Sequence, residues 1–581
     1  MNFKELDISF IVIEFFATNQ QKFSDLAVCN GMLENECGRK TFFESADQLN
    51  QFIAVITEKS NLVEEPNRRE YGDFQTSQEL ASKSAAYIKA ISNFDSFDFI
   101  LEPTCGKGNF IIAALKIFID IKKIVGVEIY QPYVWETKFK ILSYFLQNQN
   151  ASKPEIEIIH ANVFDFDFNR LSKETKQLKT VVIGNPPWVT NSELSAIDSK
   201  NLPRKTNFKK HSGLEAMTGK GNFDIGESIS LLILKHFSLH EGYFGFLVKN
   251  SVVKNLIFDQ KNNALPIGKI QKLNIDAKKE FNVSVDACYF VAKFKLPYEF
   301  TCTDFDFYSL NENRTFGWIE NKFVNSISDY KKASDVEGKC QFVWRQGIKH
   351  DCSKVMEIEK YNGHYKNGLN QEFTIENDLV FGLLKSSDLK NTTTNSYRKL
   401  TIVTQRKIGQ KTNYIKRDFP KTFAYLNQNA EYFDKRKSSI YLGKPRFSIF
   451  GVGDYSFMPY KVAVSGMYKS THFTLVLPDN GKPIMLDDTC YFIGFEEKRF
   501  AQISLYLLNH EHAQQFLKAI IFPDSKRSIT KDILMRIDFL KLYSLCEFSM
   551  FPDELGVSLH DWTEFGEKLS PETETSQLSL F

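Results

Sequence analysis

The stretch FDFILEPTCGKGNFIIAAL, residues 97–115, decides the predicted fold. It begins with a short apolar run, passes through a turn that contains Gly106 and Gly108, and continues as an apolar segment of helical length. Glycine adopts backbone angles that other residues avoid, and it lets a ligand approach the backbone closely. The first N–H groups of the following helix have no partner within that helix. The stretch predicts a strand, a tight ligand-binding turn and a helix, although a GxG turn alone also occurs in plain strand-to-helix connections.

The same alternation extends from about residue 71 to residue 300. Short apolar runs such as KIVGVEIY (123–130), KTVVIGNPPW (179–188) and DACYFVAKF (286–294) are separated by longer amphipathic segments. Buried strands that alternate with helices are typical of parallel sheets covered on both faces. We therefore expect a doubly wound, Rossmann-like α/β domain with a mixed, mainly parallel sheet.

The chain of 581 residues is too long for one ordinary hydrophobic core. Residues 1–70 are expected to form a helical extension, and residues 71–300 the α/β domain. From about residue 301 to residue 550 the pattern becomes irregular, aromatic and basic, which indicates a separate α+β domain. Residues 551–581 are acidic and are expected to be loosely ordered.

Composition excludes several classes of protein. The hydrophobic fraction of 43% and the charged fraction of 25% are typical of a globular protein. We find no apolar run long enough to span a membrane and no secretory signal. The nine cysteines include no CxxC pair, so we expect neither a disulfide framework nor a metal site, and a cytoplasmic location. No nuclease-like motif or phosphate-binding P-loop is present, which argues against a fused restriction nuclease or translocase.

Charge is distributed unevenly along the chain. Residues 398–469 contain 15 Lys and Arg against four Asp and Glu, a net charge of +11. Because the whole chain carries only +2, the remainder carries −9. This asymmetry indicates a polyanionic partner that is held by one part of the molecule.

Two polar side chains follow the next predicted strands. Glu128 ends the second strand, about 20 residues after the glycine turn, where an acidic residue can accept hydrogen bonds from both hydroxyls of a ribose. Asn162 follows the third strand in HANVF and is placed to meet an adenine ring. Together with the turn, these residues predict a nucleoside-binding site.

The fourth predicted strand ends in the stretch VVIGNPPWVT, residues 181–190. The side-chain oxygen of Asn185 and the carbonyl of Pro186 are two acceptors for the two N–H groups of an exocyclic amine. The fixed φ of Pro186 and Pro187 holds the backbone rigidly, and preorganised acceptors stabilise the positive charge that develops on a reacting nitrogen. An exposed Trp188 would offer a flat face for stacking. The stretch predicts a clamp for a flat molecule that carries an amine.

The segments EPTCGKGNF, GVEIY, HANVF and NPPW together resemble a class I S-adenosylmethionine-dependent methyltransferase. Their order resembles the gamma-type N6-adenine DNA methyltransferases of restriction-modification systems, over about residues 70–300. The resemblance implies S-adenosyl-L-methionine as cofactor, a flipped-out adenine in double-stranded DNA as substrate, and no covalent enzyme intermediate. It also implies a modification component that acts as a monomer beside a separately encoded restriction endonuclease.

The family motifs assign roles to individual residues of this sequence. Cofactor contacts are implied for Thr76, Glu102, Thr104, Gly106, Gly108, Glu128, Asn162 and Asn185. Catalytic roles are implied for Asn185, Pro186, Pro187 and Trp188. Trp188 and Phe281 are expected to sandwich the extruded base, and Asp224 stands at the start of a later helix.

Two positions depart from the family pattern. Asn162 stands where the family usually has Asp, and its oxygen can still accept a hydrogen bond from an adenine amine. Cys105 replaces a small residue in the glycine turn, and we interpret it as a packing residue and not as a nucleophile.

The basic second half resembles, more loosely, the target-recognition domain of these enzymes. Lys and Arg neutralise phosphates, while Arg, Asn and Gln can read base edges. The preferred DNA-binding candidates are Arg406, Lys407, Lys411, Lys435, Arg436, Lys444 and Arg446. A second basic segment, residues 199–223, follows the clamp and is hypothesised to contact DNA beside the target base.

Other readings of the sequence stay open at this point. An NPPW-type clamp also suits an amine in RNA, the N4 amine of cytosine, or a protein glutamine. A non-catalytic DNA-binding protein on a methyltransferase scaffold is a further alternative. The sequence does not give the recognition site, because that depends on side-chain placement and DNA shape.

Overall fold

The computed structural model describes two compact units, residues 1–323 and residues 324–581. The residues whose structure is described are residue 3 and residues 6–58, 75–189, 224–468, 470–523 and 527–570. The basic segment 199–223, predicted to contact DNA, lies outside these ranges.

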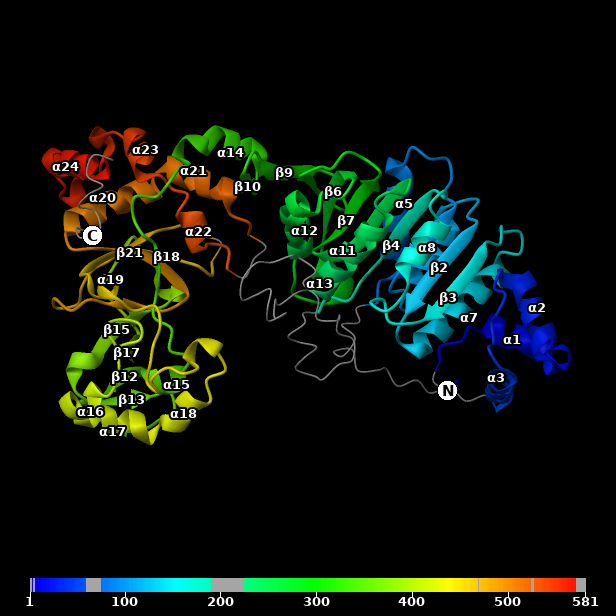
Figure 1. Ribbon diagram of the computed structural model, residues 1–581, viewed down its shortest axis with the longest axis horizontal. Helices are drawn as coiled ribbons and strands as arrows, with labels where there is room; N and C mark the ends of the chain where they lie inside the picture. The colour runs from blue at the N-terminus through cyan, green and yellow to red at the C-terminus, as the bar shows by residue number, and fades with distance from the viewer. Residues whose placement is uncertain are drawn as a thin grey trace. The chain divides into compact units, whose positions relative to one another are not determined.

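A ten-stranded sheet forms the centre of the first unit, in the order β10-β9-β8-β6-β7-β5-β4-β1-β2-β3 (Figure 1). The strands are β1 (Phe99–Glu102), β2 (Lys123–Glu128), β3 (Glu155–His160), β4 (Thr180–Gly184), β5 (Gly242–Lys249), β6 (Ile267–Ile275), β7 (Ala287–Phe294), β8 (Thr301–Asp306), β9 (Glu312–Ile319) and β10 (Lys322–Val324). Strands β1 to β5 pair in parallel, and β7 runs antiparallel between β5 and β6. The predicted mixed sheet with a parallel centre is confirmed.

Helices cover both faces of this sheet. They are α5 (Gln78–Ile91), α6 (Asn109–Ile117), α7 (Gln131–Gln147), α8 (Phe168–Glu174), α11 (Ile225–Phe237), α12 (Asn250–Asn263) and α13 (Ala277–Phe281). Ile100 and Val181 share a core with α5, α6 and α7. The ring of Phe99, the residue before Ile100, lies 6.5 Å from that of Phe237 on α11, and α11 contacts α8 and α12. Alternate residues of a strand thus pack against different helix layers, which confirms the doubly wound fold.

The N-terminal residues share the core of the α/β domain. Helices α1 (Phe10–Thr18) and α2 (Leu26–Cys37) contact α7, and α3 (Ala46–Glu58) contacts α1. Trp135 of α7 packs against the rings of Phe3 and Phe43. The backbone N–H of Ile156 on the edge strand β3 donates to the Gly38 carbonyl at 3.2 Å. The N-terminal residues therefore cover part of the edge strand β3, whose backbone groups could otherwise pair with a strand of another chain.

The expected domain boundary at residue 300 falls inside the sheet of the first unit. Strand β8 pairs in parallel with β6, and β9 pairs with β8. Lys272 of β6 and Asp304 of β8 form a buried ion pair at 2.9 Å. Residues 301–323 therefore belong to the same hydrogen-bonded layer as the α/β domain.

The second unit contains two smaller sheets, in the orders β11-β21-β18-β19-β16 and β14-β13-β12-β17-β15-β20. Their strands are β11 (Arg345–Gln346), β12 (Glu357–Tyr361), β13 (His364–Asn367), β14 (Glu372–Phe373), β15 (Val380–Leu384), β16 (Thr393–Thr394), β17 (Lys399–Ile402), β18 (Tyr460–Ser465), β19 (Thr474–Val476), β20 (Met485–Leu486) and β21 (Cys490–Phe495). Most of the strand pairs are antiparallel. Along the residues that the structure describes, no α-helix interrupts the run from β12 to β17 or the run from β18 to β21, and this separation of strands from helices is expected for an α+β unit.

The helices of the second unit include one in the region predicted to be loosely ordered. They are α14 (Ile327–Ala333), α15 (Ser353–Met356), α16 (Tyr414–Asp418), α17 (Pro420–Gln428), α18 (Ala430–Asp434), α19 (Asp454–Phe457), α20 (Lys498–Asn509), α21 (Glu511–Ile520), α22 (Lys531–Leu534), α23 (Phe539–Ser544) and α24 (Leu559–Leu569). Helix α24 buries Trp562, Phe565 and Leu569. The side chains of Ser558 and Asp561 form a capping box at its start, so residues 558–569 are packed and capped.

All nine cysteines are buried and free of disulfide bonds. Within the described ranges, no helix combines the length and the apolar character that crossing a membrane requires.

Candidate functional site

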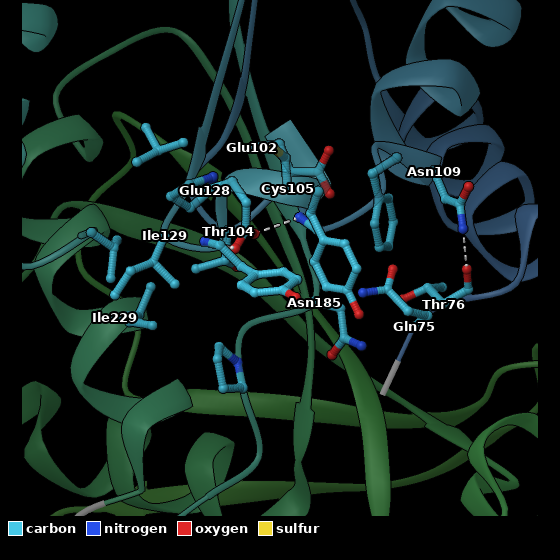
Figure 2. A pocket seen from close by; sticks show the side chains of 18 of the residues that line it. Gln75, Thr76, Glu102, Thr104, Cys105, Asn109, Glu128, Ile129, Asn185 and Ile229 are labelled. Carbon is cyan, nitrogen blue, oxygen red and sulfur yellow. Dashed lines mark hydrogen bonds between the residues drawn. The ribbon is translucent and has the colours of Figure 1, made fainter. Parts of the chain in front are cut away.

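A cavity lies where β1, β2 and β4 end in the first unit (Figure 2). It holds about 830 Å³ of empty space, including the part that opens to solvent. It is lined by Gln75, Thr76, Glu102, Pro103, Thr104, Cys105, Gly106, Asn109, Phe110, Val127, Glu128, Ile129, Tyr130, Tyr133, Ala161, Val163, Asn185, Pro187, Ile225 and Ile229. The carboxyl ends of parallel strands are where doubly wound sheets bind their ligands.

The glycine turn between β1 and α6 has the conformation that its sequence requires. Gly106 has φ +50° and Gly108 has φ +74°, both in the left-handed region. A Cβ atom at Gly108 would lie 2.6 Å from Cγ2 of Thr137, and one at Gly106 would lie 3.0 Å from Nε2 of Gln75. Neither position accepts a side chain without displacing a neighbour. Gly106 lines the cavity, whereas Gly108 does not and is instead the N-cap residue that precedes α6.

Glu128 joins the end of β2 to the glycine turn. Its Oε2 accepts from the backbone N–H of Gly106 at 2.8 Å, and its Oε1 accepts from that of Tyr130 at 2.7 Å. An ionised carboxylate has about four acceptor positions, and these two bonds use one position on each oxygen. The residue therefore organises the turn and presents a negative charge to the cavity.

Glu102 and Thr104 place further polar atoms at the end of β1. Glu102 is 2% exposed, and burial raises the pKa of its carboxyl well above the ordinary value, with the negative charge of Glu128 acting in the same direction. Glu102 Oε2 and Thr104 Oγ1 are buried and have no hydrogen-bond partner among the described residues. Buried polar atoms are normally paired, so these two indicate a ligand that brings donors into the cavity.

Replacing Glu102 with glutamine is expected to stabilise the cofactor-free protein. Because the folded state raises the pKa of Glu102, the ionised carboxylate destabilises the fold once the pH rises above the ordinary value of 4.5. The melting temperature of Glu102→Gln should therefore match that of the wild type near pH 4 and exceed it increasingly as the pH rises. The gain should level off above the raised pKa, at about 1.4 kcal/mol for each pH unit between the ordinary and the raised pKa. Thermal unfolding at several pH values measures it, and a difference that does not depend on pH would contradict the assignment.

The segment before α5 is fastened to the glycine turn. Asn109 at the start of α6 donates from Nδ2 to the Thr76 carbonyl at 2.7 Å, as the dashed line in Figure 2 shows. Gln78 donates in return to the Asn109 carbonyl at 3.1 Å. Lys140 of α7 holds the Asn109 side chain at 2.8 Å. Gln75 and the buried Thr76 thereby become one wall of the cavity.

The structure places Asn185 and Pro187 in the cavity but buries Trp188. The indole of Trp188 is only 4% exposed, and its N–H donates to the Leu247 carbonyl of β5 at 3.1 Å. The ring of Phe281 packs edge-on against it, with centroids 4.9 Å apart and an angle of 69° between the planes. The expectation of an exposed indole face is therefore wrong, because β5 and α13 enclose the ring. Pro186, Trp188 and Phe281 are not among the lining residues.

The start of α11 holds the Asn185–Trp188 turn from the other side. Ile225 donates its backbone N–H to the Val189 carbonyl at 2.9 Å. Asp224 caps the helix by accepting from the Gly226 N–H at 2.9 Å and forms an ion pair with Lys249 at 2.9 Å. These contacts fix the backbone that carries Asn185.

Asn162 does not line the cavity, although Ala161 and Val163 do. Its Oδ1 accepts from the Phe164 N–H at 2.9 Å and so stabilises the turn after β3. In this structure Asn162 is therefore not placed to contact an adenine ring in the cavity. Cys105 lines the cavity, and burial raises the pKa of its thiol well above the ordinary value, which disfavours a nucleophilic thiolate.

Several lining residues were not predicted from the sequence. Tyr130 and Tyr133 follow Glu128 directly, and their ring centroids lie 4.9 Å apart in an edge-on pair. Their closeness to Glu128 in the chain was the available signal. Ile225 and Ile229 lie one helical turn apart on α11, which is separated from the clamp by a long segment, so no local pattern connected them with the site.

The DNA-binding candidates of the second unit fall into different groups. Arg406, Lys407, Lys411 and Lys444 are exposed, and the three lysines form no ion pair within the described part of the chain. Lys435 is paired with Glu431 at 2.9 Å, and Arg446 with Asp434 at 3.0 Å.

Arg436 has a structural role that the sequence did not indicate. Its guanidinium donates to four backbone carbonyls, those of Phe433 at 3.1 Å, His350 at 3.3 Å, Ser448 at 2.7 Å and Arg446 at 2.6 Å. It also lies 3.7 Å from the centroid of the Tyr441 ring. The assignment of Arg436 to DNA binding is corrected, because its donors are engaged within the protein.

Comparisons with known proteins agree with this architecture. No family model matches the chain. The chain is 38% identical over 476 residues to the Type II methyltransferase M.NspV from Nostoc sp. (strain ATCC 29411 / PCC 7524), an alignment that covers 82% of this chain and 97% of that protein. It is 25% identical over 229 residues to the Type II methyltransferase M.VspI from Vibrio sp. (strain 343), covering 39% of this chain and 48% of that protein.

Among solved structures, the chain resembles the Type IIL restriction-modification enzyme MmeI in complex with DNA. The TM-score is 0.52 at 12% sequence identity, and the match covers 99% of this chain and 93% of that chain. Because the sequence identity is only 12%, the similarity to this structure shows a shared fold and nothing about function.

Proposed function

The chain belongs to the type II methyltransferases of restriction-modification systems, and from this membership we propose that it is a site-specific adenine-N6 DNA methyltransferase. The methyl donor in this proposal is S-adenosylmethionine, and the acceptor is the exocyclic amine of an adenine flipped out of double-stranded DNA. The observation that carries the proposal is the presence of Asn185 in the same cavity as Glu102, Glu128 and Gly106.

The residues of the cavity suit the proposed cofactor. The carboxylate of Glu128 would accept hydrogen bonds from ribose hydroxyls, next to the close backbone approach at Gly106. Glu102 Oε2 and Thr104 Oγ1, which lack partners among the described residues, would accept from the ammonium group of the methionine part. The negative charge of Glu128 also suits a cationic ligand, and a cation would lower the raised pKa of Glu102. When bound, the cofactor supplies an electrophilic methyl group on a sulfonium.

Asn185 is the proposed catalytic residue. The lone pair of an adenine N6 atom is delocalised into the ring, which makes the amine a poor nucleophile. The side-chain oxygen of Asn185 and the carbonyl of Pro186 would accept from the two N–H groups and favour a tetrahedral nitrogen. Because Pro186 and Pro187 restrict the backbone and α11 holds it through Val189, the acceptors would need little reorganisation during the reaction.

Trp188 is buried and therefore does not have the base-stacking role that was expected of an exposed indole. Its indole supports the backbone of the clamp through Leu247, so we assign it as a positioning residue. Phe281 is partly exposed and stands beside Trp188, which leaves it as a candidate to contact the extruded base. Extrusion costs a few kcal/mol, and contacts of this kind offset part of that cost.

The second unit is the proposed target-recognition domain. The exposed cations Arg406, Lys407, Lys411 and Lys444 suit phosphate contacts, whereas Lys435 and Arg446 would first have to leave their acidic partners. We propose that the protein acts as a monomer in the cytoplasm and serves as the modification component beside a separately encoded restriction endonuclease.

Replacing Glu128 with alanine is expected to weaken cofactor binding by about 10- to 100-fold. The change removes a charged acceptor and also the bonds that hold Gly106 and Tyr130, and hydrogen bonds to charged groups contribute about 1.5–3 kcal/mol. Titration calorimetry with S-adenosylmethionine measures the effect. Glu157→Ala on β3 is the matched control, since that carboxylate pairs with Lys123 outside the cavity. Equal affinities for the two variants would contradict the proposed role.

Expression in a host that lacks DNA methylation tests the proposed function in cells. Single-molecule sequencing of the host genome should show N6-methyladenine at one recurring sequence, and cells that express Asn185→Ala should show almost none. Modified cytosine at that sequence, or unmodified DNA in cells that contain folded wild-type protein, would contradict adenine-N6 specificity.

A further inference from the structure

Residues 407–410 form a closed turn on the second unit. The Gln410 backbone N–H donates to the Lys407 carbonyl at 3.1 Å, and Ile408 and Gly409 stand at the apex. Gly409 has φ +82°, which is the angle that the third position of a type II β-turn requires. Apart from Gly409 and its two chain neighbours, no described residue has an atom within 4 Å of the place where a Cβ of Gly409 would stand, so the apex borders open space.

Two glutamines hold the base of this turn. Gln405 is fully buried, its Nε2 donates to the Gln410 carbonyl, and its Oε1 accepts from the Ile449 N–H at 2.8 Å. Gln410 Oε1 accepts in turn from the Arg406 N–H at 2.7 Å. The turn is therefore linked to the neighbouring segment at residue 449, and the position of Ile408 is fixed before any partner binds.

An apolar side chain stands at this apex among cations. Ile408 is 54% exposed, and Lys407 and Lys411 beside it are exposed and form no ion pair within the described ranges. The guanidinium of Arg406 lies 4.7 Å from the ring centroid of Phe457, which orients it next to the turn. Cations suit the phosphates of a duplex, and an aliphatic group suits the one apolar feature on a base-pair edge, the C5-methyl group of thymine in the major groove.

We propose that Ile408 is a specificity-determining residue that contacts the C5-methyl group of a thymine in the recognition sequence. Lys407 and Lys411 bind the flanking phosphates and hold the turn in the groove. This inference rests on the proposed DNA methyltransferase function and adds a named contact to it.

A double-mutant cycle between protein and DNA tests the contact. The recognition sequence is first read from plasmid DNA methylated by the wild type. Duplexes of that sequence are then prepared in which each thymine outside the target pair is replaced, one at a time, by deoxyuridine, which lacks only the methyl group. Methylation kinetics are measured for the wild type, for Ile408→Ala, and for Leu559→Ala, an exposed aliphatic residue in an acidic neighbourhood on α24 that serves as control.

One deoxyuridine substitution should lower kcat/KM of the wild type and of Leu559→Ala by about fourfold, the effect of losing one methyl-sized apolar contact. The same substitution should have almost no effect on Ile408→Ala, because the partner of the methyl group is already absent. Equal deoxyuridine effects in all three proteins would overturn the inference while leaving the methyltransferase function intact. A site whose pairs outside the target are all G·C would overturn it as well. A wild type that transfers no methyl group to DNA would overturn both the inference and the proposed function.

Discussion

Asn185→Ala is expected to lower kcat for DNA methylation by about a hundred- to a thousandfold, the usual cost of removing one preorganised transition-state contact. The side chain lines the cavity at the end of β4, where it would accept a hydrogen bond from the reacting amine. The interaction strengthens as positive charge develops on the nitrogen, so its loss acts mainly on the transition state. Affinity for S-adenosylmethionine should change by only a few-fold, because Glu102, Thr104 and Glu128 remain. Single-turnover methylation and cofactor titration together measure the two effects.

A matched control separates this role from a general loss of an amide. Asn148→Ala removes an exposed asparagine at the end of α7, where its Nδ2 donates to the Tyr144 carbonyl. That variant should retain wild-type kcat. If Asn185→Ala kept more than about a tenth of wild-type kcat at saturating cofactor and DNA, the amine clamp would not be the source of catalysis.

Arg436→Ala is expected to destabilise the second unit by about 3 kcal/mol, a value in the upper range for single substitutions. The change leaves the carbonyls of Phe433, His350, Ser448 and Arg446 without their common donor and removes the packing on Tyr441. Arg436→Lys should recover only part of the loss, because an ammonium cannot reproduce the planar fork of a guanidinium. Thermal unfolding and limited proteolysis measure the effect, and new cleavage sites should fall within residues 324–581.

Lys435→Ala is the control for this experiment, since the neighbouring side chain is exposed, forms a surface ion pair with Glu431 and lies 5.7 Å from the ring centroid of Tyr432. Its melting temperature and protease resistance should equal those of the wild type. If Arg436→Ala had wild-type stability and instead lost DNA affinity, the original interpretation of Arg436 as a phosphate contact would be restored.

The parts of the site that sequence could predict are those that depend on local backbone chemistry. Gly106 and Gly108 are required by the left-handed turn between β1 and α6, and the prolines restrict the clamp whatever surrounds them. Glu128 could be located because it ends a strand whose register follows from the apolar pattern. The alternating α/β pattern likewise gave the doubly wound sheet.

The parts that sequence missed depend on contacts between distant segments. Trp188 is buried because Leu247 and Phe281, far along the chain, enclose it. Arg436 looks like one of many cations in a basic segment until the carbonyls of His350 and Ser448 are brought to it. The boundary at residue 300 was placed too early for the same reason, since only the pairing of β8 with β6 assigns the following strands to the first sheet.

Adenine-N6 specificity is tested most directly by identifying the nucleoside that the purified protein methylates. Wild-type protein is incubated with radiolabelled S-adenosylmethionine and unmethylated plasmid DNA, and the DNA is then digested to nucleosides and separated. The label is expected in N6-methyldeoxyadenosine. Label in N4-methyldeoxycytidine, or unlabelled DNA from a protein that binds the cofactor, would contradict this expectation.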